Sequence, residues 1–384
     1  MDNIKVMDKQ QLQMLHILVY NYADGYYHVS KDIEDYPEAW AIAAWSKRGP
    51  GKTTSAMLYM LEKNTKFLYM KRTKGDVELL CTSKATADME TDDINPFSPV
   101  NRLLGTNIRP HMILKKEALA GFYHCDSDDN PQGAPIGYCL AFNGVKSFKG
   151  MNFDFCDYMI FDEFIPQIGE RTSAGQNEGE LLLDFYMTAM RDRIQRGLPE
   201  IKLLLFANAE SVATPITRTL EIMDDIIELT YSSETRLYLE DRNILLHHIK
   251  PSEVAISKME EQTGIYKAMA GTAWGAKTYE GLFAHNDFTA LKKVDMRGYK
   301  PLTSYFYENK RVYIYINAEG KYYMTYSKAQ KVEVYDLNIE GSAQAFFYDY
   351  VVDLQLAIIE GLLNVEKYTM YDLVTNYKKY FKKF

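Results

Sequence analysis

Short apolar runs alternate with helical patterns through the first half of the chain. Each run is continuously apolar and is bounded by polar, glycine or proline residues, as is typical of strands that are buried on both faces of a parallel sheet. The runs that we expect to form strands are 41–45, 66–71, 136–142, 157–161 and 201–207. Residues 53–63 and 180–195 have the apolar spacing of helices. Strands that alternate with helices predict an α/β fold with a largely parallel sheet.

Residues 81–135 are the least regular part of this half. They contain the polar segments DMETDD, NPFSP and DSDDNPQG, which are rich in turn-forming residues. We therefore expect surface insertions here, outside the core of the sheet.

The pattern changes after about residue 229. Residues 251–270 have a helical pattern, and alternating apolar residues on both sides of Ala318-Glu319-Gly320 predict a β-hairpin. Residues 343–362 and 365–383 are expected to be helices. The sequence thus predicts an α/β domain over 1–228, a linker or lid region over 229–285, and a separate α+β domain over 286–384.

Length and charge narrow the class of protein. A chain of 384 residues favours two or three domains. With 44 basic and 52 acidic residues its formal net charge is −8, so any contact with DNA must depend on locally placed cations. No apolar run approaches the length of a membrane span, and the first residues do not resemble a signal peptide. The four cysteines form no C-x-x-C pair, which favours free thiols in a reducing compartment.

A glycine-rich loop follows the run 41–45 and opens a helix; it reads Ser46-Lys47-Arg48-Gly49-Pro50-Gly51-Lys52-Thr53. This strand–loop–helix context is that of a phosphate-binding P-loop, whose glycines let backbone N–H groups wrap around phosphates. Lys52 is expected to reach the β- and γ-phosphates of ATP, Thr53 to ligate Mg²⁺, and Thr54 to complete the ATP-binding set. Serine stands at position 46 where the strict pattern has glycine, so a glycine-rich turn before an ordinary helix is the alternative.

Two carboxylates follow the apolar run 157–161. Asp162 and Glu163 come at the carboxyl end of a buried strand, where open α/β sheets bind ligands. Asp162 is expected to hold Mg²⁺, and Glu163 to orient and deprotonate the attacking water. Alone, such a pair is more often a solvated strand end or a helix cap, but together with a P-loop it predicts ATP hydrolysis.

Two other polar residues fit the same chemistry. Asn208 ends the run 201–207, where its amide could sense the γ-phosphate or simply end the strand in a turn. Arg191 precedes this strand and could stabilise the phosphoryl group in a neighbouring subunit. From the residues alone, the more usual interpretation of Arg191, with Arg193 and Arg196, is an arginine cluster favoured by a helix C-terminus.

These motifs together resemble a known family. SKRGPGKT, KFLYMKRTK, KSFKGMNFDFCDYMIFDEFI, MRDR and LLFANAESV occur in this order. They are similar to the DNA-encapsidation ATPases of small short-tailed phages, which are relatives of terminase large subunits in the additional-strand, catalytic-glutamate class of P-loop ATPases. The resemblance covers about residues 40–215 and is weak afterwards.

The resemblance implies roles for single residues. Lys52 and Thr53 would bind nucleotide and metal, and Glu163 would be the catalytic acid. Arg191 falls where the family has its trans-acting arginine, with Arg193 as second choice, and Asn208 where it has a polar coupling residue. The family's DNA-gripping loop follows the second strand, which makes Lys71, Arg72 and Lys74 expected DNA contacts and Lys149 a further one; a solvated strand end is the alternative for Lys74.

For the C-terminal domain the resemblance implies a vestigial RNase H-like nuclease. Asn317 follows the strand 312–316, where an active nuclease would need an aspartate, and Asp336, Asp349 and Asp353 are the remaining carboxylates. We therefore expect no cutting activity and a docking role.

The resemblance thus implies an ATP-driven translocase that moves double-stranded DNA into a viral procapsid. It implies a homo-oligomeric, pentameric ring, ATP and Mg²⁺ as ligands, the portal or connector as partner, and a structural packaging RNA as a further candidate partner. The motor would act in the host cytoplasm, docked transiently on the procapsid portal, and would be absent from the mature virion. The alternatives are a terminase with an active nuclease, another P-loop DNA-dependent ATPase such as a helicase, and a nucleotide-binding protein that does not hydrolyse.

Overall fold

The computed structural model of the chain describes residues 7–82, 94–148, 151–167, 177–283, 286–329 and 331–381. Contacts divide the chain into two compact units. The first comprises Met1–Leu220 with Asp225–His285, and the second Glu221–Asp224 with Asn286–Phe384. Within the described ranges, no helix combines the length and the apolar character that a membrane span requires.

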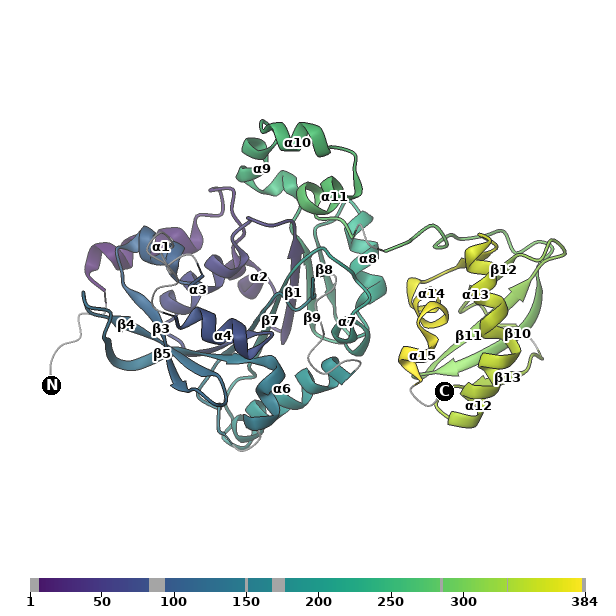
Figure 1. Cartoon of the computed structure of the whole chain (residues 1–384), viewed down its shortest axis with the longest axis horizontal. Helices are drawn as coiled ribbons and strands as arrows, with labels where there is room; N and C mark the ends of the chain where they lie inside the picture. The colour runs from purple at the N-terminus through teal and green to yellow at the C-terminus, as the bar shows by residue number, and fades with distance from the viewer. Residues whose placement is uncertain are drawn as a thin grey trace. The chain divides into compact units, whose positions relative to one another are not determined.

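The first unit alternates strands and helices (Figure 1). Its strands are β1 (Ala41–Ser46), β2 (Phe67–Lys71), β3 (Ile108–Leu114), β4 (Leu119–Cys125), β5 (Pro131–Ala141), β6 (Tyr158–Asp162), β7 (Lys202–Asn208), β8 (Arg236–Leu239) and β9 (Ile244–His248). Its helices are α1 (Lys9–Tyr20), α2 (Val29–Asp35), α3 (Lys52–Glu62), α4 (Lys74–Leu80), α5 (Ser98–Leu104), η2 (Phe142–Phe148), α6 (Glu178–Gln195), α7 (Pro215–Thr219), α8 (Met223–Tyr231), η4 (Pro251–Glu253), α9 (Ala255–Glu260), α10 (Gly264–Met269), α11 (Ala273–Gly275) and η5 (Ala276–Glu280).

The strands of this unit form one nine-stranded sheet in the order β3-β4-β5-β2-β6-β7-β1-β9-β8. The neighbours from β5 to β9 are parallel, as the apolar runs predicted. Every residue of β1 is buried, because helices cover both faces of the central strands. A mostly parallel α/β sheet is therefore confirmed.

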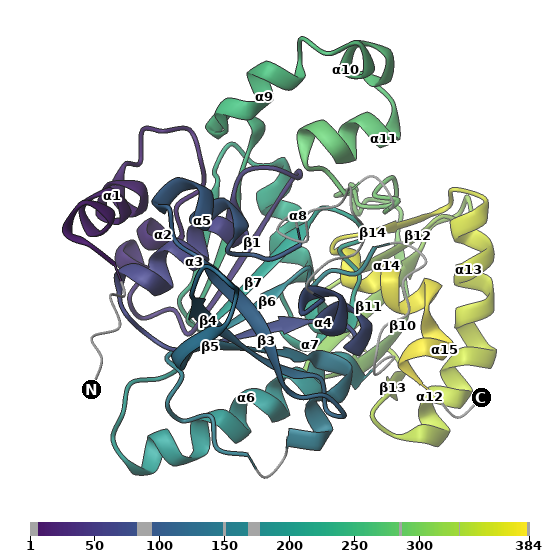
Figure 2. The same cartoon turned by 60° about the vertical axis from the view of Figure 1, so that its left-hand side comes forward.

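The direction of the crossovers places the helices in two layers. The chain moves one way along the sheet from β1 through α3 to β2, and the opposite way from β6 through α6 to β7. Because such crossovers are right-handed, α3 and α6 must cover opposite faces. The views in Figures 1 and 2 agree with this arrangement. Helices α1, α2 and α5 pack with α3, so the P-loop helix lies at the centre of a helical layer.

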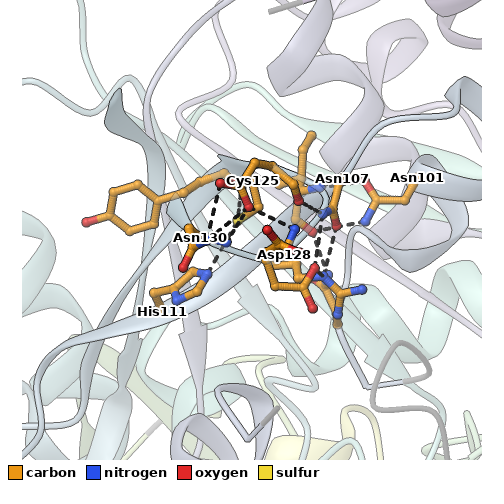
Figure 3. Close-up of polar contacts among 12 residues, drawn as sticks. Asn101, Asn107, His111, Cys125, Asp128 and Asn130 are labelled. Carbon is orange, nitrogen blue, oxygen red and sulfur yellow. Dashed lines mark hydrogen bonds and ion pairs between the residues drawn. The ribbon is translucent and has the colours of Figure 1, made fainter. Parts of the chain in front are cut away.

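The expectation of surface insertions over 81–135 is wrong for much of that segment. Strands β3 and β4 pair antiparallel with each other and with β5, and they extend the sheet. Of the three polar segments that suggested an insertion, only DSDDNPQG lies at the turn between β4 and β5, where Asp126 Oδ1 accepts from the N–H groups of Asp128 at 3.0 Å and Asn130 at 2.9 Å (Figure 3). NPFSP leads into α5, and DMETDD lies outside the described residues. The polar residues thus predicted one turn correctly, but the strands beside it were not predicted.

The sheet also continues beyond the expected boundary at residue 228. Strand β9 pairs parallel with β1, and β8 pairs antiparallel with β9. The helices η4 to η5, in the segment 251–280, lie outside the sheet. The 229–285 region is therefore partly core and partly a helical extension.

The second unit is an α+β fold with a five-stranded sheet in the order β13-β10-β11-β12-β14. Its elements are β10 (Lys300–Tyr307), β11 (Lys310–Ile316), β12 (Tyr322–Thr325), β13 (Val334–Asp336), α12 (Glu340–Phe346), η6 (Phe347–Val351), α13 (Val352–Ile359), β14 (Leu363–Val365), α14 (Tyr368–Thr375) and α15 (Tyr377–Tyr380). The predicted hairpin is β11–β12, and Asn317 closes its turn by accepting from the N–H groups of Glu319 and Lys321.

All four cysteines lie in described parts of the chain and are free thiols, as predicted.

Candidate active site

The loop between β1 and α3 borders an open cavity of about 370 Å³ at the carboxyl edge of the sheet. Gly49 has φ +91° and Gly51 has φ +87°, a backbone region that favours glycine. The cavity is lined by Arg48, Gly49, Pro50, Gly51, Lys52, Thr53, Thr54, Asp162, Glu163, Ala207 and Asn208. The structure thus brings the predicted P-loop, the two carboxylates and the Asn208 amide together around one space.

Lys52 lies at the base of this cavity. Its ammonium group donates to Ser46 Oγ at 2.5 Å and lies 3.5 Å from Asn208 Oδ1. Burial lowers the pKa of Lys52 to about 8, although the carboxylates of Asp162 and Glu163 act in the opposite direction. Serine at position 46 therefore makes a contact that glycine could not make, because its hydroxyl accepts from the Lys52 ammonium.

Asp162 lies beside the first turn of the P-loop helix. Its Oδ2 accepts from Thr53 Oγ1 at 3.0 Å and from the Tyr69 hydroxyl at 2.7 Å. A hydroxyl and a carboxylate are hard oxygen ligands, and Mg²⁺ commonly binds through one or two such groups together with water and phosphate. Thr53 and Asp162 therefore fit a magnesium site, where the ion would neutralise charge on the β- and γ-phosphates.

Glu163 has an unusual backbone conformation, with φ +59°. Arg72 holds this turn, since its Nε donates to the Glu163 carbonyl oxygen at 3.0 Å and its guanidinium also donates to the Phe164 carbonyl oxygen. Arg72 Nη1 in turn pairs with Glu178 Oε1 at 2.8 Å, and both side chains are buried. A left-handed non-glycine residue that is fixed by its surroundings is typical of functional sites.

Arg72 is therefore wrongly predicted as a DNA contact. A guanidinium that is buried and committed to two carbonyl oxygens and a carboxylate cannot reach a DNA backbone in this conformation. It acts on the position of Glu163.

The other expected DNA contacts are Lys71, Lys74 and Lys149, and their surroundings differ. Lys71 Nζ lies 3.8 Å from Asp162 Oδ2; burial lowers the pKa of Lys71, but the carboxylates of Asp162 and Glu163 outweigh that effect and raise it. Lys74 is the first residue of α4 and donates to the Lys116 carbonyl oxygen at 3.0 Å. Lys149 lies outside the described residues.

Two arginines of α6 differ sharply in their surroundings. Arg191 is exposed, whereas Arg193 is buried and donates to the carbonyl oxygens of Asp154 and Pro199. Arg193 also pairs with Asp157 at 2.9 Å. The surroundings of Arg193 leave Arg191 as the better candidate for a contact with another subunit.

A second cavity, of about 400 Å³, adjoins the P-loop and has a largely apolar lining. It shares Gly49, Gly51 and Thr54 with the first, and its other lining residues include Leu18, Tyr26, Leu58, Pro99 and Leu103. An apolar cavity that continues from a phosphate cradle suits the base of a nucleotide. This cavity is not predicted by the sequence, because its lining comes from α1, α3, α5 and the segment before α2, which share no motif.

The carboxylates of the second unit do not converge on a metal site in the described parts of the chain, where no group of three or more His, Cys, Asp and Glu residues could hold an ion. Asp349 Oδ2 accepts from the Tyr335 hydroxyl at 2.9 Å, and Asp336 Oδ1 accepts from the Asn338 backbone N–H at 3.0 Å.

The fold of this chain is similar to that of known proteins. No family model matches the chain, and no curated protein matches its sequence. Among solved structures, the chain is similar to the bacteriophage Phi-29 viral genome packaging motor assembly, with a TM-score of 0.60 and 15% identity over 93% of this chain and 99% of that chain. It is also similar to the Phi-28 gp11 DNA packaging motor, with a TM-score of 0.54 and 15% identity over 91% of this chain and 97% of that chain. At this identity the likeness establishes a shared fold that extends through both units.

Proposed function

We propose that this chain is the ATPase of a viral genome-packaging motor, which couples ATP hydrolysis to the movement of double-stranded DNA into a procapsid. The observation that carries the proposal is the fold shared with two packaging motors over more than nine tenths of the chain. The cavity formed by the P-loop and the end of β6 supplies the chemistry that such a motor needs.

ATP would bind with its phosphates in the P-loop cavity and its base in the adjoining apolar cavity. Lys52 would contact the phosphates, and Thr53 with Asp162 would hold Mg²⁺. Glu163 would orient the attacking water and accept its proton, with Arg72 fixing the backbone of that residue. Asn208, whose amide oxygen faces Lys52, would respond to the γ-phosphate.

A homo-oligomeric ring would complete the site. Arg191 is exposed on α6, and in such a ring its guanidinium would contact the nucleotide of a neighbouring subunit and stabilise the charge of the transferring phosphoryl group. A ring would also place several weak contacts around one duplex. The portal of the procapsid and a packaging RNA are the partners that we propose for docking, with the second unit as docking domain and without nuclease activity.

Contact with DNA would be made by phosphate-binding cations at the pore, including Lys74 and Lys149. Because phosphate contacts contain no base information, binding should be independent of sequence and weakened by salt. A net charge of −8 is compatible with this, since only the pore lining must be positive.

Linear duplex DNA is expected to stimulate ATP hydrolysis by the full-length chain, irrespective of its sequence, and rising salt should abolish the stimulation. The measurement is the steady-state rate of phosphate release with and without duplexes of unrelated sequence. A rate indifferent to duplex DNA would contradict the proposal. Unwinding of a short duplex would instead favour a helicase, and metal-dependent nicking of the DNA would favour a cleaving terminase.

A further inference from the structure

The helical segment from α9 to η5, residues 255–280, is attached to the nucleotide site by charged contacts. Figure 1 shows α9, α10 and α11 gathered beyond the end of β1. No residue of α10 is buried, and Met259, Ile265 and Trp274 are exposed. An element with so few buried side chains has little hydrophobic stabilisation of its own, so its position depends on a small number of specific contacts.

The first of these contacts involves the P-loop itself. Lys47, the second residue of the loop, has a side chain only 1% exposed, and its ammonium pairs with the carboxylate of Glu260 at the end of α9. The described residues that line the phosphate cavity include Arg48 and Lys52 but not Lys47. The Lys47 ammonium of the P-loop thus contacts the helical segment and does not line the cavity.

Two further contacts join the segment to the same site. Lys277 of η5 lies 3.0 Å from Glu210 Oε1, two residues beyond Asn208. Gly281 has φ +68° and lies against the P-loop backbone, since a Cβ at this position would come within 2.8 Å of the Lys47 nitrogen. A shift of the P-loop backbone at Lys47 would therefore displace Gly281, the residue that follows the end of the segment.

We propose that the Lys47–Glu260 pair is a nucleotide-sensitive latch, an inference that rests on the proposed binding of ATP. The phosphates of a bound nucleotide place several negative charges in the loop that contains Lys47. They would attract the Lys47 ammonium and repel the Glu260 carboxylate, because water screens charges only weakly where the side chains are buried or half-buried. Nucleotide binding therefore weakens the pair and loosens residues 255–280. By linkage, removal of the Glu260 charge strengthens nucleotide binding.

The test compares the wild-type chain with Glu260→Gln, using hydrogen–deuterium exchange and the affinity for a non-hydrolysable ATP analogue with Mg²⁺. In the wild type, the analogue should accelerate amide exchange over 255–280. In Glu260→Gln, amide exchange over 255–280 should be fast even without nucleotide, and the analogue should not accelerate it further. The affinity of this variant for the analogue should be about fivefold higher than that of the wild type, which is the lower end of typical coupling between sites. Lys47→Met should also speed exchange in the absence of nucleotide.

Glu261→Gln is the matched control, because Glu261 is the exposed next residue and the substitution removes the same charge. It should behave as the wild type. The latch is contradicted if bound analogue leaves exchange over 255–280 unchanged or slows it, or if Glu261→Gln reproduces the effects of Glu260→Gln. If the wild type binds no analogue at all, the proposed nucleotide function itself fails, which the affinity measurement reveals independently of exchange.

Discussion

Replacement of Glu163 by glutamine is expected to lower kcat for ATP hydrolysis by about 10²–10⁴-fold, the usual contribution of a positioned general base. Glutamine keeps the size and hydrogen-bonding reach of the side chain but cannot accept a proton from water. Nucleotide affinity should be retained or raised, since one negative charge is removed from the cavity that holds the phosphates. Steady-state kinetics with a separate binding measurement distinguish the two effects.

Glu180→Gln is a suitable control for this substitution. Glu180 is an exposed residue in the first turn of α6, so the same chemical change there should leave kcat close to that of the wild type. Unchanged turnover in Glu163→Gln would remove the catalytic assignment and would favour a nucleotide-binding protein that does not hydrolyse.

Replacement of Arg191 by alanine is expected to reduce DNA-stimulated ATP hydrolysis by about 10³–10⁵-fold, the range measured for arginines that act on phosphoryl transfer in other NTPases. Because the guanidinium would serve the neighbouring subunit, the variant should also inhibit mixtures with wild-type chains by more than its share of subunits. The measurement is ATPase rate against the fraction of variant chains in mixed assemblies.

Arg196→Ala provides the comparison. Arg196 lies five residues further along, its guanidinium pairs with Asp154, and neither residue lines the P-loop cavity. Loss of the Arg196 guanidinium should leave the ATPase rate, and its dependence on the fraction of variant chains, close to those of the wild type. A strictly proportional decline for Arg191→Ala would show that Arg191 does not act across a subunit boundary.

Local sequence signals predicted the central strands and the residues that meet around the P-loop cavity. The P-loop and the Asp-Glu pair each occupy consecutive residues, and their meeting at one sheet edge follows from parallel strands ending together. Strand β3 was missed because it lies at the edge of the sheet, where half-buried residues such as Arg109 and His111 obscure the alternation of apolar and polar positions.

The contacts that position the site could not be predicted from the sequence. Arg72 and Glu178 are separated by 106 residues, and Lys47 and Glu260 by 213. In sequence, Arg72 is one of several cations after β2 and nothing distinguishes it from an exposed neighbour. Only the three-dimensional fold shows that its guanidinium is buried against the backbone of the turn at Glu163.

Displacement of a third strand from a DNA triplex tests the central claim most directly, because it detects movement along a duplex without strand separation. With ATP and Mg²⁺, the wild-type chain is expected to displace a triplex-forming strand from a linear duplex while leaving the duplex intact, and Glu163→Gln should displace none. DNA-stimulated hydrolysis without any displacement of the third strand would contradict the account, since ATP turnover would then occur without translocation.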